Sequence, residues 1–127
     1  MVNAYVGPAY AELGQLIIDD AGVDAKDPVM YAEVMDGAVD CAIFYQNENS
    51  ITFRQCRLDT IEKIYDIWEI SAMEDCWSGI IFEISGSKFR VSIIYSTDFR
   101  DSEYYSDRSR KVAVDKFGEI KFDYSNF

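Results

Sequence analysis

The sequence predicts an α+β fold, a two-layer domain in which an antiparallel sheet of about five strands in two hairpin units is covered by helices on one face. Two alternating apolar runs meet at Asp36-Gly37 and two more meet at Gly86-Ser87, and both dipeptides are hairpin signals. Two other segments repeat their apolar residues with the period of a helix. The predicted order of elements is therefore α-β-β-β-α-β-β-α.

Each element follows from a local pattern. We expect helices at residues 8–20, 59–75 and 102–117, and strands at residues 29–35, 38–45, 51–54, 78–85 and 88–95. Gly22 and Gly118 are expected to end the first and third helices, because glycine readily adopts the conformation that terminates a helix. The chain of 127 residues, 49% of them apolar, fits one domain spanning residues 1–127.

The two hairpins differ in the charges that they place opposite each other. A two-residue turn sets the first register so that Glu33 faces Asp40, which is a repulsive pair. The same counting in the second hairpin places Glu83 opposite Arg90, which is an attractive pair. The first hairpin therefore needs a compensating cation or a functional reason for its two carboxylates.

The third strand can supply that cation. A turn at residues 47–49 puts Ile51 and Phe53 on the buried face and turns Arg54 to the other face, beside Asp40. Arg54 would then neutralise Asp40 within a structural network. The alternative is that the carboxylates serve a binding surface.

The charge balance of the chain favours a cationic partner. Asp and Glu number 23 against 12 Lys and Arg, and the net charge is −11. Residues 1–86 alone hold 16 acidic and 4 basic residues, a net charge of −12. Such a field repels nucleic acid and anionic lipid, so we expect neither as a partner. The apolar runs are much shorter than the roughly 20 residues that cross a bilayer, which predicts a cytoplasmic protein without membrane contact.

Catalysis has few available groups in this chain. The sequence contains no histidine, the commonest general base and zinc ligand, and its three cysteines form no C-x-x-C motif. An acidic cluster at Asp19, Asp20, Asp24 and Asp27 lacks the regular spacing of a calcium loop. We therefore expect no catalytic residues, cofactor or metal, and the alternative is a carboxylate or metal-dependent enzyme.

Two surfaces are candidates for a protein interface. The first is the exposed face of the first hairpin, where carboxylates lie among aromatic rings: Tyr31, Glu33, Asp40 and Phe44. The second is an acidic stripe on the second helix: Glu62, Asp66 and Glu69. The alternatives are a structural network for the first surface, a solvated helix face for the second, and homodimer formation through the open sheet face.

The order of several motifs resembles that of the YezG-like immunity proteins, the antitoxins partnered with LXG-type and other contact-delivered polymorphic toxins. The resemblance covers roughly residues 29–118. Its motifs are Tyr31-Ala-Glu-Val-Met-Asp-Gly37, Phe44-Tyr45, the block Trp77–Tyr95 with its Gly86-Ser-Lys-Phe89 turn, and Phe117-Gly118.

The resemblance implies an immunity protein that neutralises the C-terminal domain of a bacterial toxin, commonly a nuclease encoded next to it. An acidic surface suits that role, because a nuclease attracts phosphate with Lys and Arg in its cleft. The alternative is an adaptor or scaffold module that binds a basic cellular protein.

Overall fold

The computed structural model describes residues 6–22, 25–35, 38–47, 50–72, 77–86, 88–95, 104–118 and 121–123. The elements are α1 (Val6–Ala21), β1 (Val29–Met35), β2 (Ala38–Asn47), β3 (Ser50–Gln55), α2 (Leu58–Ala72), β4 (Gly79–Ser85), β5 (Lys88–Ile94), α3 (Tyr105–Phe117) and β6 (Lys121–Asp123). The predicted α+β class and the order α-β-β-β-α-β-β-α are confirmed, and the short strand β6 follows α3.

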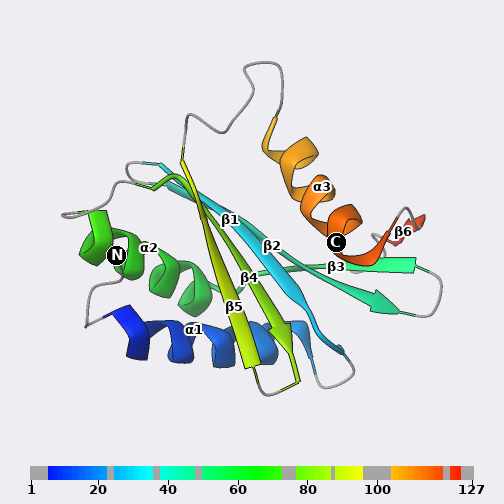
Figure 1. The fold of residues 1–127 in the computed structure, drawn as a ribbon, viewed down its shortest axis with the longest axis horizontal. Coiled ribbons are helices and arrows are strands. Elements are labelled where there is room, and N and C mark those ends of the chain that lie inside the picture. Colours follow the sequence, from blue (N-terminus) through cyan, green and yellow to red (C-terminus); the bar gives the residue numbers. More distant parts are fainter. Residues whose placement is uncertain are drawn as a thin grey trace.

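The strands form one sheet in the order β5-β4-β1-β2-β3-β6 (Figure 1). The two hairpins are joined through an antiparallel pairing of β1 with β4, and β6 adds to the edge of β3 in parallel. Both predicted hairpin registers are confirmed: Glu33 lies opposite Asp40, and Glu83 lies opposite Arg90. The repulsive and attractive pairs therefore exist as the sequence predicts.

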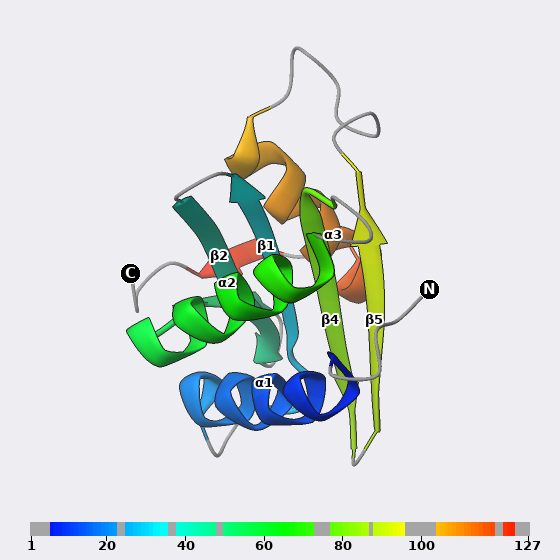
Figure 2. The same ribbon diagram turned by 90° about the vertical axis from the view of Figure 1, so that its left-hand side faces the viewer.

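The helices lie on both faces of the sheet. Figures 1 and 2 show α1 and α2 together on one face and α3 on the other. The prediction of helices on one face only is correct for α1 and α2 and wrong for α3. The apolar residues of α3 pack against a second hydrophobic core on the opposite face of the sheet. That second core contains Val29, Ala42, Phe44, Ile51, Phe53 and Ala113.

The register of β3 differs by one residue from the predicted one. The sequence predicts Arg54 on the face of Asp40, but Arg54 pairs with Ile43 on the opposite face, and Phe44 pairs with Phe53. A shift of one residue turns every side chain of a strand to the opposite face. Ile51 and Phe53 are therefore buried beneath α3 instead of α1 and α2, and Arg54 lies on the face that carries those two helices.

The helix ends follow the glycines. Gly22 and Gly118 have φ angles of 97° and 89°, which side-chain-bearing residues rarely adopt. Their amides donate to the carbonyl oxygens of Ile18 and Val114, and this satisfies one carbonyl in the last turn of each helix. Within the described part of the chain, no helix has the length and apolar character needed to cross a bilayer.

Candidate protein-binding surface

The carboxylate of Glu33 is neutralised inside the molecule. Arg108 of α3 donates to it twice, from Nε to Oε2 at 2.5 Å and from Nη2 to Oε1 at 2.7 Å. The hydroxyl of Tyr31 donates to the same Oε2 at 2.5 Å. The hydrogen bonds between Arg108 and Glu33 raise the pKa of the Arg108 guanidinium above its ordinary value. The three side chains fasten α3 to β1.

This arrangement corrects the first predicted binding surface. Tyr31, Phe44 and Glu33 are only 1%, 2% and 8% exposed, because α3 and the second core cover them. Tyr31 is stacked on Tyr105 of α3, with ring centroids 5.9 Å apart. Of the four predicted residues, Asp40 alone remains exposed. The surface predicted from the sequence is therefore an internal contact. A homodimer through this sheet face could not use Tyr31 and Phe44 either, because both side chains are buried.

The structural network proposed as the alternative exists, but with a different cation. Arg54 lies on the opposite face, donates to the hydroxyl of Tyr45 at 3.4 Å and holds its guanidinium 5.9 Å from the centre of that ring. Arg108 takes the role expected of Arg54, and it neutralises Glu33 rather than Asp40. No local pattern could reveal this pair, since its members are 75 residues apart.

The acidic stripe on α2 has the opposite character. Glu62, Asp66 and Glu69 are exposed, and their spacing places them on one side of the helix within two turns. Among the described residues, no Lys or Arg nitrogen lies within 4.0 Å of these carboxylates. The three charges are therefore available to a partner.

The basic residues in and next to α2 turn toward α1 instead. Lys63 Nζ lies 2.6 Å from Glu12 Oε2, and Arg57 Nε lies 3.3 Å from Asp20 Oδ1. Asp20 is itself buried and also accepts from the backbone amide of Arg57 and from Thr60 Oγ1. Lys63 and Arg57 are thus paired with carboxylates of α1, and among the described residues neither lies within 4.0 Å of a carboxylate of the stripe.

Both ends of α2 are fixed in place. The contacts of Asp20 hold its first turn, and Trp68 Nε1 donates to the carbonyl of Trp77 at 2.8 Å near its last turn. Trp77 is buried, and its own Nε1 donates to Ser71 Oγ at 2.7 Å. A helix held in this way fixes the backbone positions from which its carboxylates project, which lowers the ordering cost of binding.

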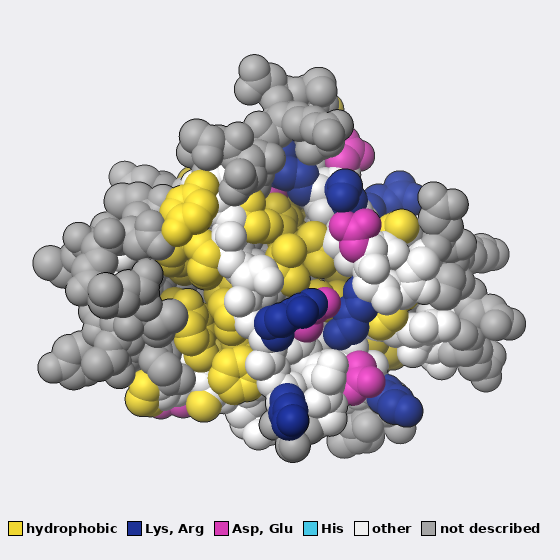
Figure 3. Space-filling model, in the orientation of Figure 1, with side chains coloured by type: hydrophobic (Ala, Val, Ile, Leu, Met, Phe, Trp, Pro, Cys, Tyr) yellow, Lys and Arg dark blue, Asp and Glu magenta, His cyan; other side chains and the backbone are white. Residues whose placement is uncertain are grey.

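The face that carries α3 and the β4–β5 hairpin has a mixed charge. Figure 3 shows Lys and Arg side chains beside Asp and Glu side chains across this face. On these elements Arg90 and Glu83 form an ion pair at 2.6 Å, and Lys111 and Asp115 form another at 3.2 Å. Glu83 and Asp115 on this face thus have basic partners, whereas Asp40 on the same face has none among the described residues.

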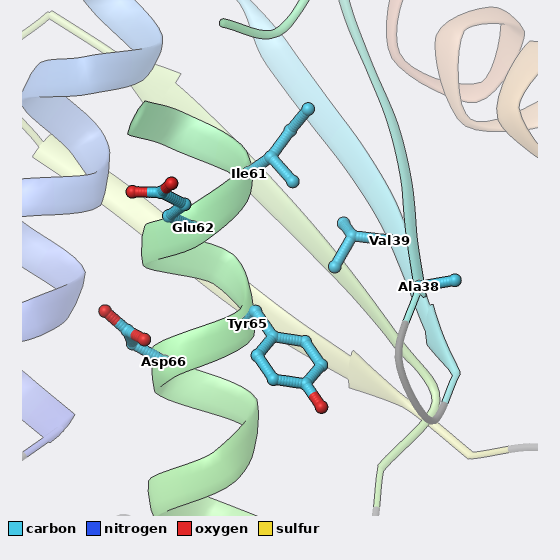
Figure 4. Close-up of a pocket in the computed structure, with 6 residues that line it drawn as sticks. All are labelled: Ala38, Val39, Ile61, Glu62, Tyr65 and Asp66. Atoms are coloured by element: carbon cyan, nitrogen blue, oxygen red, sulfur yellow. The ribbon is translucent and has the colours of Figure 1, made fainter. Parts of the chain in front are cut away.

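A groove lies beside the acidic stripe, between α2 and the start of β2. Its volume is about 440 Å³, and its lining residues are Ala38, Val39, Ile61, Glu62, Tyr65 and Asp66. Ile61 and Tyr65 project from α2 toward Val39, whereas Glu62 and Asp66 project from the adjacent side of the helix and away from Val39 (Figure 4). The groove thus has apolar walls and an acidic border along α2.

The acidic cluster considered for a cation is divided among other contacts. Asp20 binds the start of α2, Asp19 accepts from Gln15, and Asp27 accepts from the amide of Gly86. Asp24 lies outside the described residues. Across the described ranges, no group of three or more Asp, Glu, Cys or His side chains is placed to hold a metal ion.

No protein-family model and no curated protein sequence matches the chain. The surfaces are therefore interpreted from their own chemistry. By that criterion, the sequence pattern found both acidic candidates, but only the long-range packing of α3 separates them: the first is an internal contact, and the second is open to solvent.

Proposed function

We propose that this protein is a cytoplasmic immunity protein that binds and neutralises a cognate bacterial toxin domain, and that the acidic stripe Glu62, Asp66 and Glu69 is its docking surface. The observation that carries the proposal is the contrast in pairing. These three carboxylates are exposed without a described cation in reach, while Glu33, Asp20 and Glu12 all have one. Unpaired charges on a fixed helix give a cationic partner both faster association and complementarity.

The partner we propose is a nuclease domain. Such a domain carries Lys and Arg in its cleft to hold phosphate, and an acidic helix can occupy the same cleft. The resemblance of residues 29–118 to YezG-like immunity proteins supports this class of partner. Neutralisation requires binding alone, so this chain needs no catalytic group for it.

Co-expression tests the proposal. The toxin domain encoded beside this gene is induced in a bacterial host, with wild-type protein or with the triple variant Glu62→Lys, Asp66→Lys and Glu69→Lys. We expect the wild type to restore growth and the variant to fail, because like charges then face each other. The matched control carries Asp19→Lys, Asp40→Lys and Asp115→Lys, three exposed acidic residues away from the stripe, and is expected to protect.

The outcomes separate the alternatives. Survival of cells that express the toxin domain without this protein would remove the immunity function. A complex that forms without restoring growth would favour the adaptor alternative. Loss of protection in the control but not in the stripe variant would place the interface on another face and would restore interest in Asp40.

A further inference from the structure

The groove beside the acidic stripe differs chemically from the stripe itself. Three apolar side chains, those of Val39, Ile61 and Tyr65, are half-buried and line it from β2 and α2. Its volume of about 440 Å³ lies in the range of roughly 300–1,000 Å³ that is typical of ligand pockets. Removing this apolar lining from water would add free energy of binding in proportion to the area covered.

We propose that the groove receives one large apolar side chain from a cationic segment of the partner, and that Lys or Arg residues flanking it reach Glu62 and Asp66. This inference rests on the proposed function and specifies the segment of the partner that makes the contact. An aliphatic or aromatic anchor inserted in a pocket, surrounded by complementary charge, is the usual form of an interface hot spot.

The geometry of α2 favours this combination. Ile61 and Tyr65 are one turn apart and face the groove, and Glu62 and Asp66 follow each of them by one residue on the adjacent side of the helix. A segment that lies across α2 can thus place its anchor against Tyr65 and its cation against Asp66. The long stem of a Lys or Arg can lie along the Tyr65 ring while its charge reaches the carboxylate.

The charges exclude other occupants. An acidic peptide, a nucleic acid or an anionic lipid would meet repulsion from Glu62 and Asp66. A second copy of this chain would bring a further net charge of −11 to the same place. The combination of apolar walls and unpaired carboxylates fits a cationic amphipathic segment, which is a helix-in-groove mode of recognition.

Synthetic peptides test the inference without a toxin. The probe is an acetylated helical peptide of alanine with one leucine and lysines one turn to either side. Two control peptides replace the leucine by serine or the lysines by glutamates. Amide chemical shifts of the full-length protein are followed by nuclear magnetic resonance during each titration.

We expect the lysine–leucine peptide to shift the amides of Val39, Ile61 and Tyr65. Loss of the leucine should weaken binding by about thirtyfold, which is the lower end of the hot-spot scale, and the glutamate peptide should not bind. Shifts confined to other faces, or equal affinity of the leucine and serine peptides, would overturn the inference.

Variants of the groove, measured in the complex with the toxin domain, provide a second test. Ile61→Ser removes a groove wall, and Ile70→Ser is the matched control, an exposed apolar residue on the same helix outside the groove lining. We expect Ile61→Ser to weaken the toxin complex by about tenfold and Ile70→Ser to leave it unchanged. A complex that responds to Glu62→Lys but not to Ile61→Ser would refute the groove and leave the proposed function standing. If Ile61→Ser does not fold, the peptide titration alone decides.

Discussion

Glu33 on β1 and Glu62 on α2 are both acidic residues in the first two thirds of the chain, yet they have opposite roles. Glu33 is buried and receives three hydrogen bonds, two from Arg108 and one from Tyr31. Glu62 is exposed, without a cation among the described residues. An excess of negative charge is available for binding only where the fold leaves it without an internal partner.

The largest expected change in the free energy of unfolding comes from the buried pair of Glu33 and Arg108. Replacement of Arg108 by Met leaves Glu33 buried with Tyr31 as its remaining partner, and breaking such a pair costs about 3 kcal/mol. We expect the free energy of unfolding in urea to fall by that amount. The double variant Glu33→Met and Arg108→Met removes both charges and should recover most of the loss, because a buried ion pair and an apolar pair of similar volume differ little. Equal losses in the two variants would contradict the pairing.

An intermediate effect is expected at alkaline pH. The pKa of Tyr31 is raised above its ordinary value of 10.0, mainly by burial and next by the hydrogen bond to Glu33. Burial is also the main cause that raises the pKa of Tyr105. Because these pKa values are higher in the folded state than in the unfolded state, the two tyrosines contribute fully to the free energy of unfolding below pH 10.0. The contribution is lost as the pH rises further, since the tyrosines of the unfolded chain ionise first. Urea midpoints should therefore fall above that pH. Tyr31→Phe should reduce the slope, and an unchanged slope would contradict this account.

The smallest expected effect on stability is on the exposed side. Neutralising the stripe with Glu62→Gln, Asp66→Asn and Glu69→Gln should change the free energy of unfolding by less than about 0.5 kcal/mol, because none of the three has a described partner to lose. Thermal or urea unfolding measures this. A loss as large as that of Arg108→Met would mean that the stripe is structural and would remove it as a docking surface.

Local patterns predicted most of the fold and the exposure of one of the two candidate surfaces. The turn signals gave both hairpin registers correctly, because a two-residue turn leaves no freedom of pairing. The β2–β3 connection has no such signal, and one residue of error moved Phe53 from one face to the other. The face occupied by α3 was unpredictable for the same reason, since the second core depends on that register.

The two candidate surfaces also differ in whether a local pattern or long-range packing determines them. The stripe on α2 was visible in the sequence because helical period alone places Glu62, Asp66 and Glu69 together. The burial of Glu33 was not, because its partner Arg108 comes from a helix far along the chain. Sequence patterns locate charges within an element, and only the packing between elements decides which charges remain free.

One kinetic experiment compares the two acidic regions and decides which of them a partner meets. Stopped-flow mixing measures the association rate of the toxin domain with the wild type, with the neutralised stripe variant and with Glu33→Gln at low salt. We predict that the stripe variant associates at least about tenfold more slowly, because steering by unpaired charges is lost, and that Glu33→Gln associates at the wild-type rate. A slower rate for Glu33→Gln together with an unchanged rate for the stripe variant would contradict the account.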